Sequence, residues 1–163
     1  MAISNSILIP VEEYLSTVYE PDVDYLEGQL EDRNVGEKDH GKLQLKVAKL
    51  LDTGQWFVAI ETRIEVSQNR FRAPDVCVYE REPEEQVFRS APFVVIEILS
   101  PEDRMSRMQR KMEDFYNPGC ANIWILDPWR RRAYRYDGQS LIEVPDHLVT
   151  QDSRLSLNIA GLF

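Results

Sequence analysis

An almost uninterrupted apolar segment, APFVVIEIL at residues 91–99, indicates a β-strand that is buried on both faces of a sheet. Such a strand needs a covering layer on each face, which favours an α/β domain whose sheet is flanked by helices. One acidic residue, Glu97, interrupts this segment. Because a buried charge is costly unless it is paired or bound to a metal, Glu97 requires an explanation of its own.

Three other segments have the three- and four-residue spacing of apolar side chains that is typical of amphipathic helices. They span residues 10–18, 40–51 and 102–116. The stripe expected on the third helix consists of Met105, Met108, Met112, Phe115 and Tyr116.

Extended structure is predicted where short apolar runs are bounded by turn residues. Single strands are expected at residues 56–66, 73–79, 91–99 and 122–127, and hairpins at 23–35 and 133–144. Residues 67–72 are expected to form a polar connection, and the apolar residues 155–163 to dock on the body.

The chain has 163 residues and contains no repeat, linker or low-complexity stretch, so a single domain over residues 1–163 is predicted. Its expected architecture is a mixed central sheet flanked by helices. An N-terminal helix-hairpin extension and a C-terminal hairpin are expected in addition.

The composition limits the possible partners and compartments. A net charge of −9 disfavours tight, non-specific binding to nucleic acid, although basic residues can still cluster locally. The segment MAISNSILIPVEEYL lacks the features of a secretory signal, and no apolar run approaches the roughly 20 residues of a membrane helix. Cys77 and Cys120 are therefore expected to be reduced thiols in a cytoplasmic protein that has no membrane partner.

Two carboxylates lie on strands that are otherwise apolar. Asp75 begins the run DVCVY, and Glu97 lies near the end of FVVIEIL. If these strands are neighbours, both side chains can meet at one end of the sheet and offer the oxygen ligands that Mg²⁺ or Mn²⁺ prefers. The alternative is that each carboxylate marks the point where its strand reaches solvent, or pairs with a nearby arginine.

The ordered motifs APDV, FVVIEILSP, RKMEDFY and PGCANIWILDP resemble the Uma-two family of restriction endonucleases, within the PD-(D/E)XK nuclease superfamily. The resemblance runs from DYLEGQLEDRNVG to the C-terminal apolar segment. It implies a restriction-endonuclease-like fold in which Asp75 and Glu97 bind a divalent metal, Mg²⁺ or Mn²⁺. It also implies that the backbone carbonyl of Ile98 completes the metal shell.

The chain departs from the superfamily pattern at one position. Two residues after Glu97, where the superfamily has a catalytic lysine, this sequence has Leu99. The family resemblance implies that Lys111, on the following helix, replaces it and holds or activates the attacking water. The alternative for Lys111 is a side chain whose stem covers apolar surface while its ammonium stays in water.

Several other residues have weaker claims to a site. The resemblance implies that His40 lines the site and that Asp32 is a further metal-binding or supporting carboxylate. A histidine that faces the core and bonds a backbone carbonyl is the alternative for His40. Asp24 and Glu27 could simply shape the hairpin.

Arg70 and Arg72 precede the segment that contains Asp75. They could reach a substrate phosphate there, or lie in a solvated loop.

Taken with the resemblance, the sequence predicts a metal-dependent endodeoxyribonuclease with Asp75, Glu97 and Lys111 as catalytic residues. Its expected substrate is DNA, and cleavage of both strands favours a symmetric homodimer. The alternatives are a nuclease-fold binding or assembly module with little catalysis, and a hydrolase of RNA or another phosphodiester. Convergence of the three side chains on one pocket would discriminate between an enzyme and an inert module.

Overall fold

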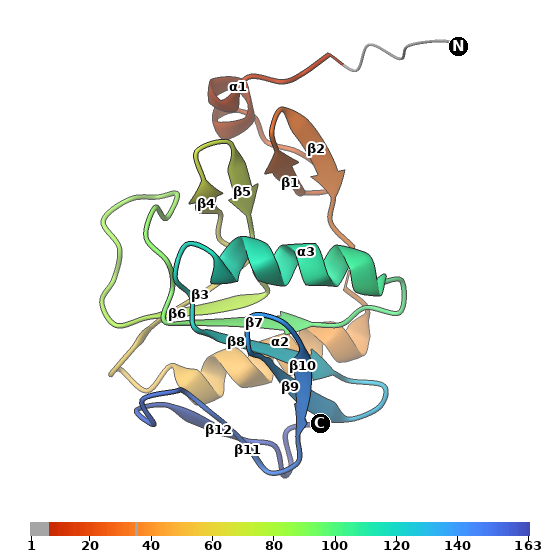
Figure 1. The fold of residues 1–163 in the computed structure, drawn as a ribbon, viewed down its shortest axis with the longest axis vertical. Helices are drawn as coiled ribbons and strands as arrows, with labels where there is room; N and C mark the ends of the chain where they lie inside the picture. Colours follow the sequence, from red (N-terminus) through yellow and green to blue (C-terminus); the bar gives the residue numbers. More distant parts are fainter. Residues whose placement is uncertain (1–6, 35) are drawn as a thin grey trace.

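A six-stranded sheet forms the centre of the molecule in the computed structural model, which describes residues 7–34 and 36–163 (Figure 1). Its strand order is β10-β9-β8-β7-β6-β3. Strands β7 and β8 pair in parallel and the other neighbours are antiparallel, so the sheet is mixed, as predicted. The strands in this order are Leu141–Val144, Arg132–Tyr136, Asn122–Asp127, Val94–Ile98, Val76–Tyr79 and Phe57–Ile60.

Helices α2 (Lys38–Leu51) and α3 (Met105–Tyr116) cover opposite faces of this sheet (Figure 1). Helix α3 also connects β7 to β8, because parallel neighbours need a crossover rather than a tight turn. Its buried residues Met108, Met112 and Phe115 pack on one face of the sheet. Burial of both faces explains why the strand β7 is almost purely apolar.

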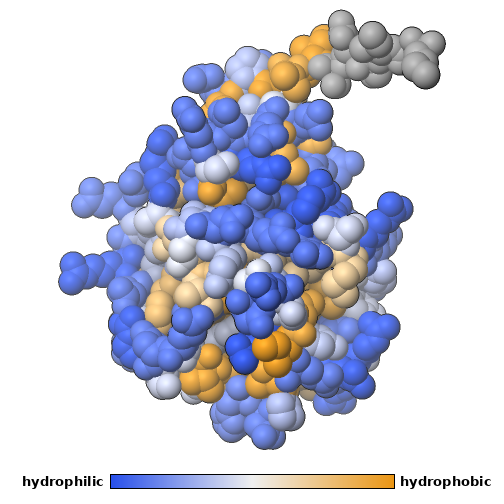
Figure 2. All heavy atoms as spheres, viewed as in Figure 1, coloured by the Kyte–Doolittle hydropathy of each residue, from blue (hydrophilic) through white to orange (hydrophobic). Residues whose placement is uncertain are grey.

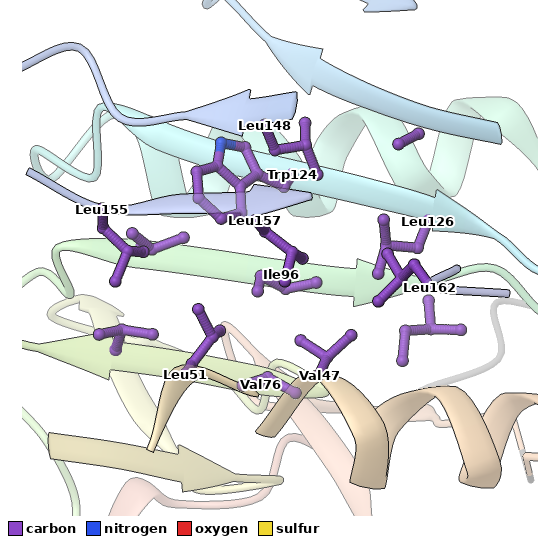
Figure 3. Packing of buried hydrophobic residues seen from close by; sticks show 14 of the residues in the cluster. Val47, Leu51, Val76, Ile96, Trp124, Leu126, Leu148, Leu155, Leu157 and Leu162 are labelled. Carbon is purple, nitrogen blue, oxygen red and sulfur yellow. The ribbon is translucent and has the colours of Figure 1, made fainter. Parts of the chain in front are cut away.

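The opposite face is closed jointly by α2 and the C-terminal segment (Figure 3). Val47 and Leu51 of α2 pack on strand residues such as Ile96, and Trp124 is 1% exposed in the same cluster. The C-terminal contribution comes from a two-stranded sheet of β11 (His147–Val149) and β12 (Ser156–Asn158). Residues 155–163 therefore dock on the body, as the sequence predicted.

A second, four-stranded sheet lies beyond α3 with the short helix α1 (Val11–Ser16) (Figure 1). Its order is β2-β1-β5-β4, and its core is a cluster of aromatic rings in which Tyr14 stacks on Tyr25 and Phe71 packs against both at an angle. Glu27 and Gly28 have φ values of 52° and 90° and form the tight turn predicted between β1 and β2. The strands in this order are Gln29–Asp32, Val23–Leu26, Arg70–Arg72 and Ile64–Ser67.

The single strand predicted over residues 56–66 is wrong. The chain forms β3, turns at Glu61, where φ is 48°, and enters β4 in the other sheet. The polar connection predicted at 67–72 is also wrong, because β4 ends at Ser67 and β5 spans Arg70–Arg72 and pairs with β4. The predicted buried stripe of α3 includes Met105, but Met105 is 68% exposed.

Within the described residues, no helix is long and apolar enough to cross a membrane.

Candidate active site

Asp75 and Glu97 meet at the same edge of the main sheet because β6 and β7 are antiparallel neighbours. Val76 pairs with Ile96, which brings the residue before β6 next to the end of β7. Asp75 Oδ2 accepts a hydrogen bond of 2.6 Å from the backbone N–H of Ile98. Both carboxylates are buried, with 7% and 2% of their residue surface exposed. The neighbouring-strand arrangement expected from the sequence is therefore present.

Lys111 reaches this pair from α3. Its Nζ lies 2.8 Å from Glu97 Oε2, and its side chain is 14% exposed. Met108 and Phe115, three residues before and four after it on the helix, are both buried. Lys111 therefore points toward the sheet, and the alternative of a lysine whose ammonium stays in water is wrong.

His40 approaches Asp75 from α2, on the opposite side of the sheet from α3. Its Nε2 lies 3.4 Å from Asp75 Oδ2, and the residue is 7% exposed. Burial is the largest single influence and opposes a charged imidazole, but the hydrogen bond to Asp75 and the negative charges of Asp75, Glu97 and Glu61 together outweigh it and raise the pKa of His40. His40 thus contacts a carboxylate of the site, not the backbone carbonyl that the alternative required.

The two carboxyl groups are shifted in opposite directions. Burial alone would raise the pKa of Asp75, but the hydrogen bond from His40 and the charge of Lys111 lower it below its usual range. Burial raises the pKa of Glu97 to about 8 despite its contact with Lys111. Near neutral pH, Asp75 is therefore ionised while Glu97 retains a proton for much of the time.

Glu97 also has an unsatisfied atom. Its Oε1 is buried and has no hydrogen-bond partner among the described residues. A buried acceptor without a partner is rare in native proteins and needs an explanation such as a bound ion. A divalent cation between Asp75 and Glu97 would satisfy it.

The donor set suits a small, hard cation. Within residues 7–34 and 36–163, no group of three or more His, Cys, Asp or Glu side chains is arranged to hold a metal ion. Mg²⁺, however, usually keeps several waters and needs only one or two carboxylates from the protein. The Asp75–Glu97 pair fits that pattern.

Asp75, Glu97 and Lys111 line a cavity of about 40 Å³. Several cationic residues also contribute to its wall. Arg33 and Arg107 lie in its wall, in a chain whose net charge is −9. Arg33 Nη1 is 3.2 Å from Asp22, and Arg107 Nε is 3.5 Å from Glu31, so both charges are partly balanced. The sequence reasoning missed both arginines, because nothing in the local pattern links them to a strand that carries an acid.

Some residues expected in or near the site lie elsewhere. Asp32 is exposed at the end of β2, and its backbone carbonyl, not its carboxylate, accepts a bond from Arg107. Asp24 instead lines the cavity, although its predicted claim to the site was weaker than that of Asp32. Glu27 lies at the surface beside Arg70.

Arg72 is not available to a substrate phosphate. It is completely buried and pairs with Asp24, Glu31 and Asp114. Arg70 also pairs with Asp114, at 2.5 Å. The proposed phosphate contact and the alternative of a solvated loop are both wrong for Arg72, because the residue belongs to β5 and joins the second sheet to α3.

A comparison with family models identifies one family. A family model named Uma2 and described as "Putative restriction endonuclease" matches residues 11–160. No curated protein matches the sequence.

Two solved structures are similar over most of the chain. A crystal structure of a "putative nuclease belonging to DUF820" from Anabaena variabilis ATCC 29413 is 23% identical, with a TM-score of 0.79 over 95% of this chain and 97% of that one. This similarity shows the fold. A cryo-EM structure of a DrdV–DNA complex is 16% identical, with a TM-score of 0.44 over 75% of this chain and 10% of that one.

Proposed function

This chain belongs to the Uma2 family, whose model is described as "Putative restriction endonuclease", and from that premise we propose that it is a divalent-metal-dependent endodeoxyribonuclease. The observation that carries the proposal is the meeting of Asp75, Glu97 and Lys111 around a buried carboxylate oxygen that has no partner. Buried charged groups with shifted pKa values that gather around one cavity are typical of functional sites. The proposed domain comprises residues 1–163 as one unit.

In this proposal Asp75 and Glu97 hold Mg²⁺ or Mn²⁺, and the backbone carbonyl of Ile98 is a further ligand. When bound, the metal would lower the pKa of an attacking water and balance the charge of the scissile phosphate. Asp75 is prepared for this role, because His40 keeps its carboxylate ionised and the N–H of Ile98 fixes its orientation.

Lys111 has a separate task. Its ammonium, held 2.8 Å from Glu97, can donate a hydrogen bond to the attacking water and so orient it toward phosphorus. Arg33 and Arg107 lie in the wall of the same cavity and can contact phosphate oxygens once a substrate displaces their acidic partners. Local cations of this kind would let an acidic protein bind DNA at the site itself.

Cleavage assays test the proposal directly. Supercoiled plasmid, duplex oligonucleotides and RNA oligonucleotides are incubated with the protein in Mg²⁺, in Mn²⁺ and in chelator. The expected result is metal-dependent cleavage of DNA by the wild type and its loss in Asp75→Asn. Asp39→Asn makes the same chemical change at an exposed aspartate of α2 and should cleave like the wild type.

Two results would favour the other functions. Cleavage of RNA but not DNA would make the protein a hydrolase of another phosphodiester. No cleavage by the wild type in either metal would favour the binding or assembly module, for which the acidic charge of −9 is the supporting observation.

Cleavage of both strands of a duplex would require two active sites of opposite polarity, which a symmetric homodimer supplies. We therefore include dimerisation, on the free protein or on DNA, in the proposal. Sedimentation velocity with and without a duplex oligonucleotide would detect it, and a monomer in both conditions would refute it.

A further inference from the structure

A large groove adjoins the candidate active site at the N-terminal end of α3. It has a volume of about 680 Å³ and lies between that end of the helix, β8 and the β9–β10 hairpin. It shares Ser100, Asp103 and Met108 with the cavity that holds Asp75 and Glu97. Anything bound in the groove would therefore lie directly beside the proposed scissile phosphate.

The walls of the groove expose apolar and aromatic surface. Met105 is 68% exposed and Trp129 is 43% exposed, and both line it together with the half-buried Tyr134 and Leu141. Figure 2 shows apolar residues interrupting the hydrophilic surface of this face of the molecule. Large apolar side chains gathered around one hollow mark a binding site more often than isolated ones do.

Trp129 is fixed by the backbone. It follows β8 at a turn in which Asp127 Oδ1 accepts hydrogen bonds of 3.0 Å from the backbone N–H groups of Trp129 and Arg130. Asp127 itself is 2% exposed, so the turn is tied to the sheet. The indole is therefore presented on a preorganised support, which reduces the entropy lost on binding.

The charges around the groove suit an anion. Asp103 uses its oxygens to accept bonds from Ser100 N–H, at 2.6 Å, and from Asn34, at 2.8 Å. Asp127 accepts the backbone hydrogen bonds of the turn, and its Oδ2 pairs with Arg130 Nη1 at 3.2 Å. Arg104, by contrast, is exposed and has no ion pair within the part of the chain that the structure describes.

Aromatic faces beside an arginine form the combination that binds a nucleobase and its phosphate. Bases stack on Trp and Tyr rings, and guanidinium groups contact the backbone. A base that is paired and stacked within a duplex cannot enter such a groove without being unstacked first. Entry is cheapest for a base that is already unpaired.

We propose that this groove binds an unpaired nucleotide next to the scissile phosphate, so that the preferred substrate is DNA with a single-stranded or unpaired stretch at the cleavage position. The inference rests on the proposed nuclease function and narrows its substrate class. Trp129 is the stacking platform, and Arg104 contacts the phosphate of the bound nucleotide.

Binding tests the groove without requiring cleavage. Fluorescein-labelled single-stranded DNA and the matched duplex are titrated with protein in chelator and followed by anisotropy. The wild type is expected to bind the single strand more tightly than the duplex. Trp129→Ala should weaken single-strand binding about tenfold or more, since each stacked base contributes an effect of that order. Trp129→Phe should retain most of the affinity.

A matched control and a direct optical signal sharpen the test. Ile142→Ala removes an apolar side chain, 36% exposed, at a position of β10 that does not line the groove, and this variant should bind like the wild type. Trp56 and Trp124 are buried, so quenching of tryptophan fluorescence by the single strand should come mainly from Trp129. The quenching should be largely absent in Trp129→Phe.

Cleavage of a fully paired duplex and of one with a short internal bulge separates the two proposals. With Mg²⁺, the wild type should cut beside the bulge faster than the paired duplex, and Trp129→Ala should lose this preference. Unchanged single-strand binding by Trp129→Ala would overturn the groove proposal. So would the conversion of a dimer of the free protein to a monomer by this substitution, because Trp129 would then belong to a dimer interface. Trp129-dependent binding of single strands without cleavage in any metal would support the groove and refute the nuclease.

Discussion

Lys111 reaches Glu97 from helix α3, whereas the superfamily pattern places its lysine on the strand two residues after the glutamate. At the expected strand position Leu99 packs into the core around α3. The ammonium still reaches Glu97, at 2.8 Å, because Lys111 lies between the buried residues Met108 and Phe115 on the helix. In the proposed mechanism, the position of the ammonium matters and the element that carries it does not.

Removing this ammonium is predicted to abolish most of the activity. Lys111→Ala should lower DNA cleavage by about a hundredfold or more, the usual cost of losing a positioned group for proton transfer or charge stabilisation. Lys111→Met, which keeps the buried stem, should show the same loss with a nearly unchanged circular dichroism spectrum. Gel-based cleavage rates measure the effect.

Lys49→Ala is the matched control, since Lys49 is exposed in the last turn of α2. If Lys111→Met cleaves DNA as fast as Lys49→Ala does, Lys111 has no catalytic role.

Glu97 gives the metal-free protein a pH dependence of known sign. Burial raises its pKa from an ordinary value near 4.5 to about 8, so the native state binds more protons than the unfolded state between these pH values. The contribution of Glu97 to stability is complete below about pH 4.5 and is lost as the pH rises through about 8. Each pKa unit corresponds to about 1.4 kcal/mol, which exceeds a typical surface effect.

As the pH rises from about 4.5 to about 8, Glu97→Gln should therefore lose less stability than the wild type. Thermal unfolding in chelator across the same pH interval measures the difference. Parallel pH profiles for the two proteins would show that Glu97 titrates normally.

At the level of single residues, the sequence could predict that Asp75 and Glu97 lie together, because an acid on an apolar strand is conspicuous. The family resemblance added Lys111. Arg33 and Arg107 could not be found in this way, because an arginine in a polar segment or on a helix is ordinary. Asp32 and Asp24 were ranked in the wrong order, since adjacent hairpin residues point to opposite faces and only the fold decides which face the site occupies.

Among the elements, α3 and the second sheet are joined by the buried guanidinium of Arg72. Arg72 Nε donates a bond of 2.8 Å to Asp114 on α3, and Nη1 donates to Asp24 on β1 at 3.0 Å and to Glu31 on β2. Asp114 lies one turn beyond Lys111 on the same helix. The network therefore fixes the helix that carries the proposed catalytic lysine.

Arg72→Leu is predicted to destabilise the protein by about 3–5 kcal/mol, because it leaves buried carboxylates without a counter-charge. Urea denaturation measures the change in the free energy of unfolding. Arg70→Leu is the control: it removes the neighbouring arginine, whose side chain is 29% exposed, and should cost less. Equal losses for the two variants would show that the buried network has no special role.

The sequence also predicted the elements unevenly, for physical reasons. β6, β7, β8 and α3 follow apolar patterns long enough to be unambiguous. The break at Glu61 and the strand β5 were missed, because a single residue with positive φ can redirect a chain without leaving a pattern. β5 also contains two arginines, which are typical of loops until their buried partners are known.

Across the whole molecule, the site is assembled from segments that are far apart in the chain. Asp24 of β1, His40 of α2, Glu97 of β7 and Lys111 of α3 all line one cavity. No local pattern encodes such an assembly, since it depends on how two sheets and two helices pack. The sequence could predict the central mixed sheet but not the second sheet beyond α3.

The core of the whole molecule also determines its thiol chemistry. Cys77 and Cys120 are free and completely buried, and burial raises the pKa of each to about 12. Both should resist alkylation in the native protein, since the thiolate is the reactive form, and both should react after unfolding without reductant. Mass spectrometry checks this. A disulfide between them, or rapid native labelling, would contradict the packing described here.

Metal binding tests the central claim without any assumption about substrate. Mn²⁺ is titrated calorimetrically into the wild type at a pH above about 8, where Glu97 is largely ionised. Saturable binding is predicted for the wild type and for the exposed-site control Asp39→Asn, with strong loss of affinity in Asp75→Asn and in Glu97→Gln. No binding by the wild type, or unchanged binding by both site variants, would contradict a metal site between Asp75 and Glu97.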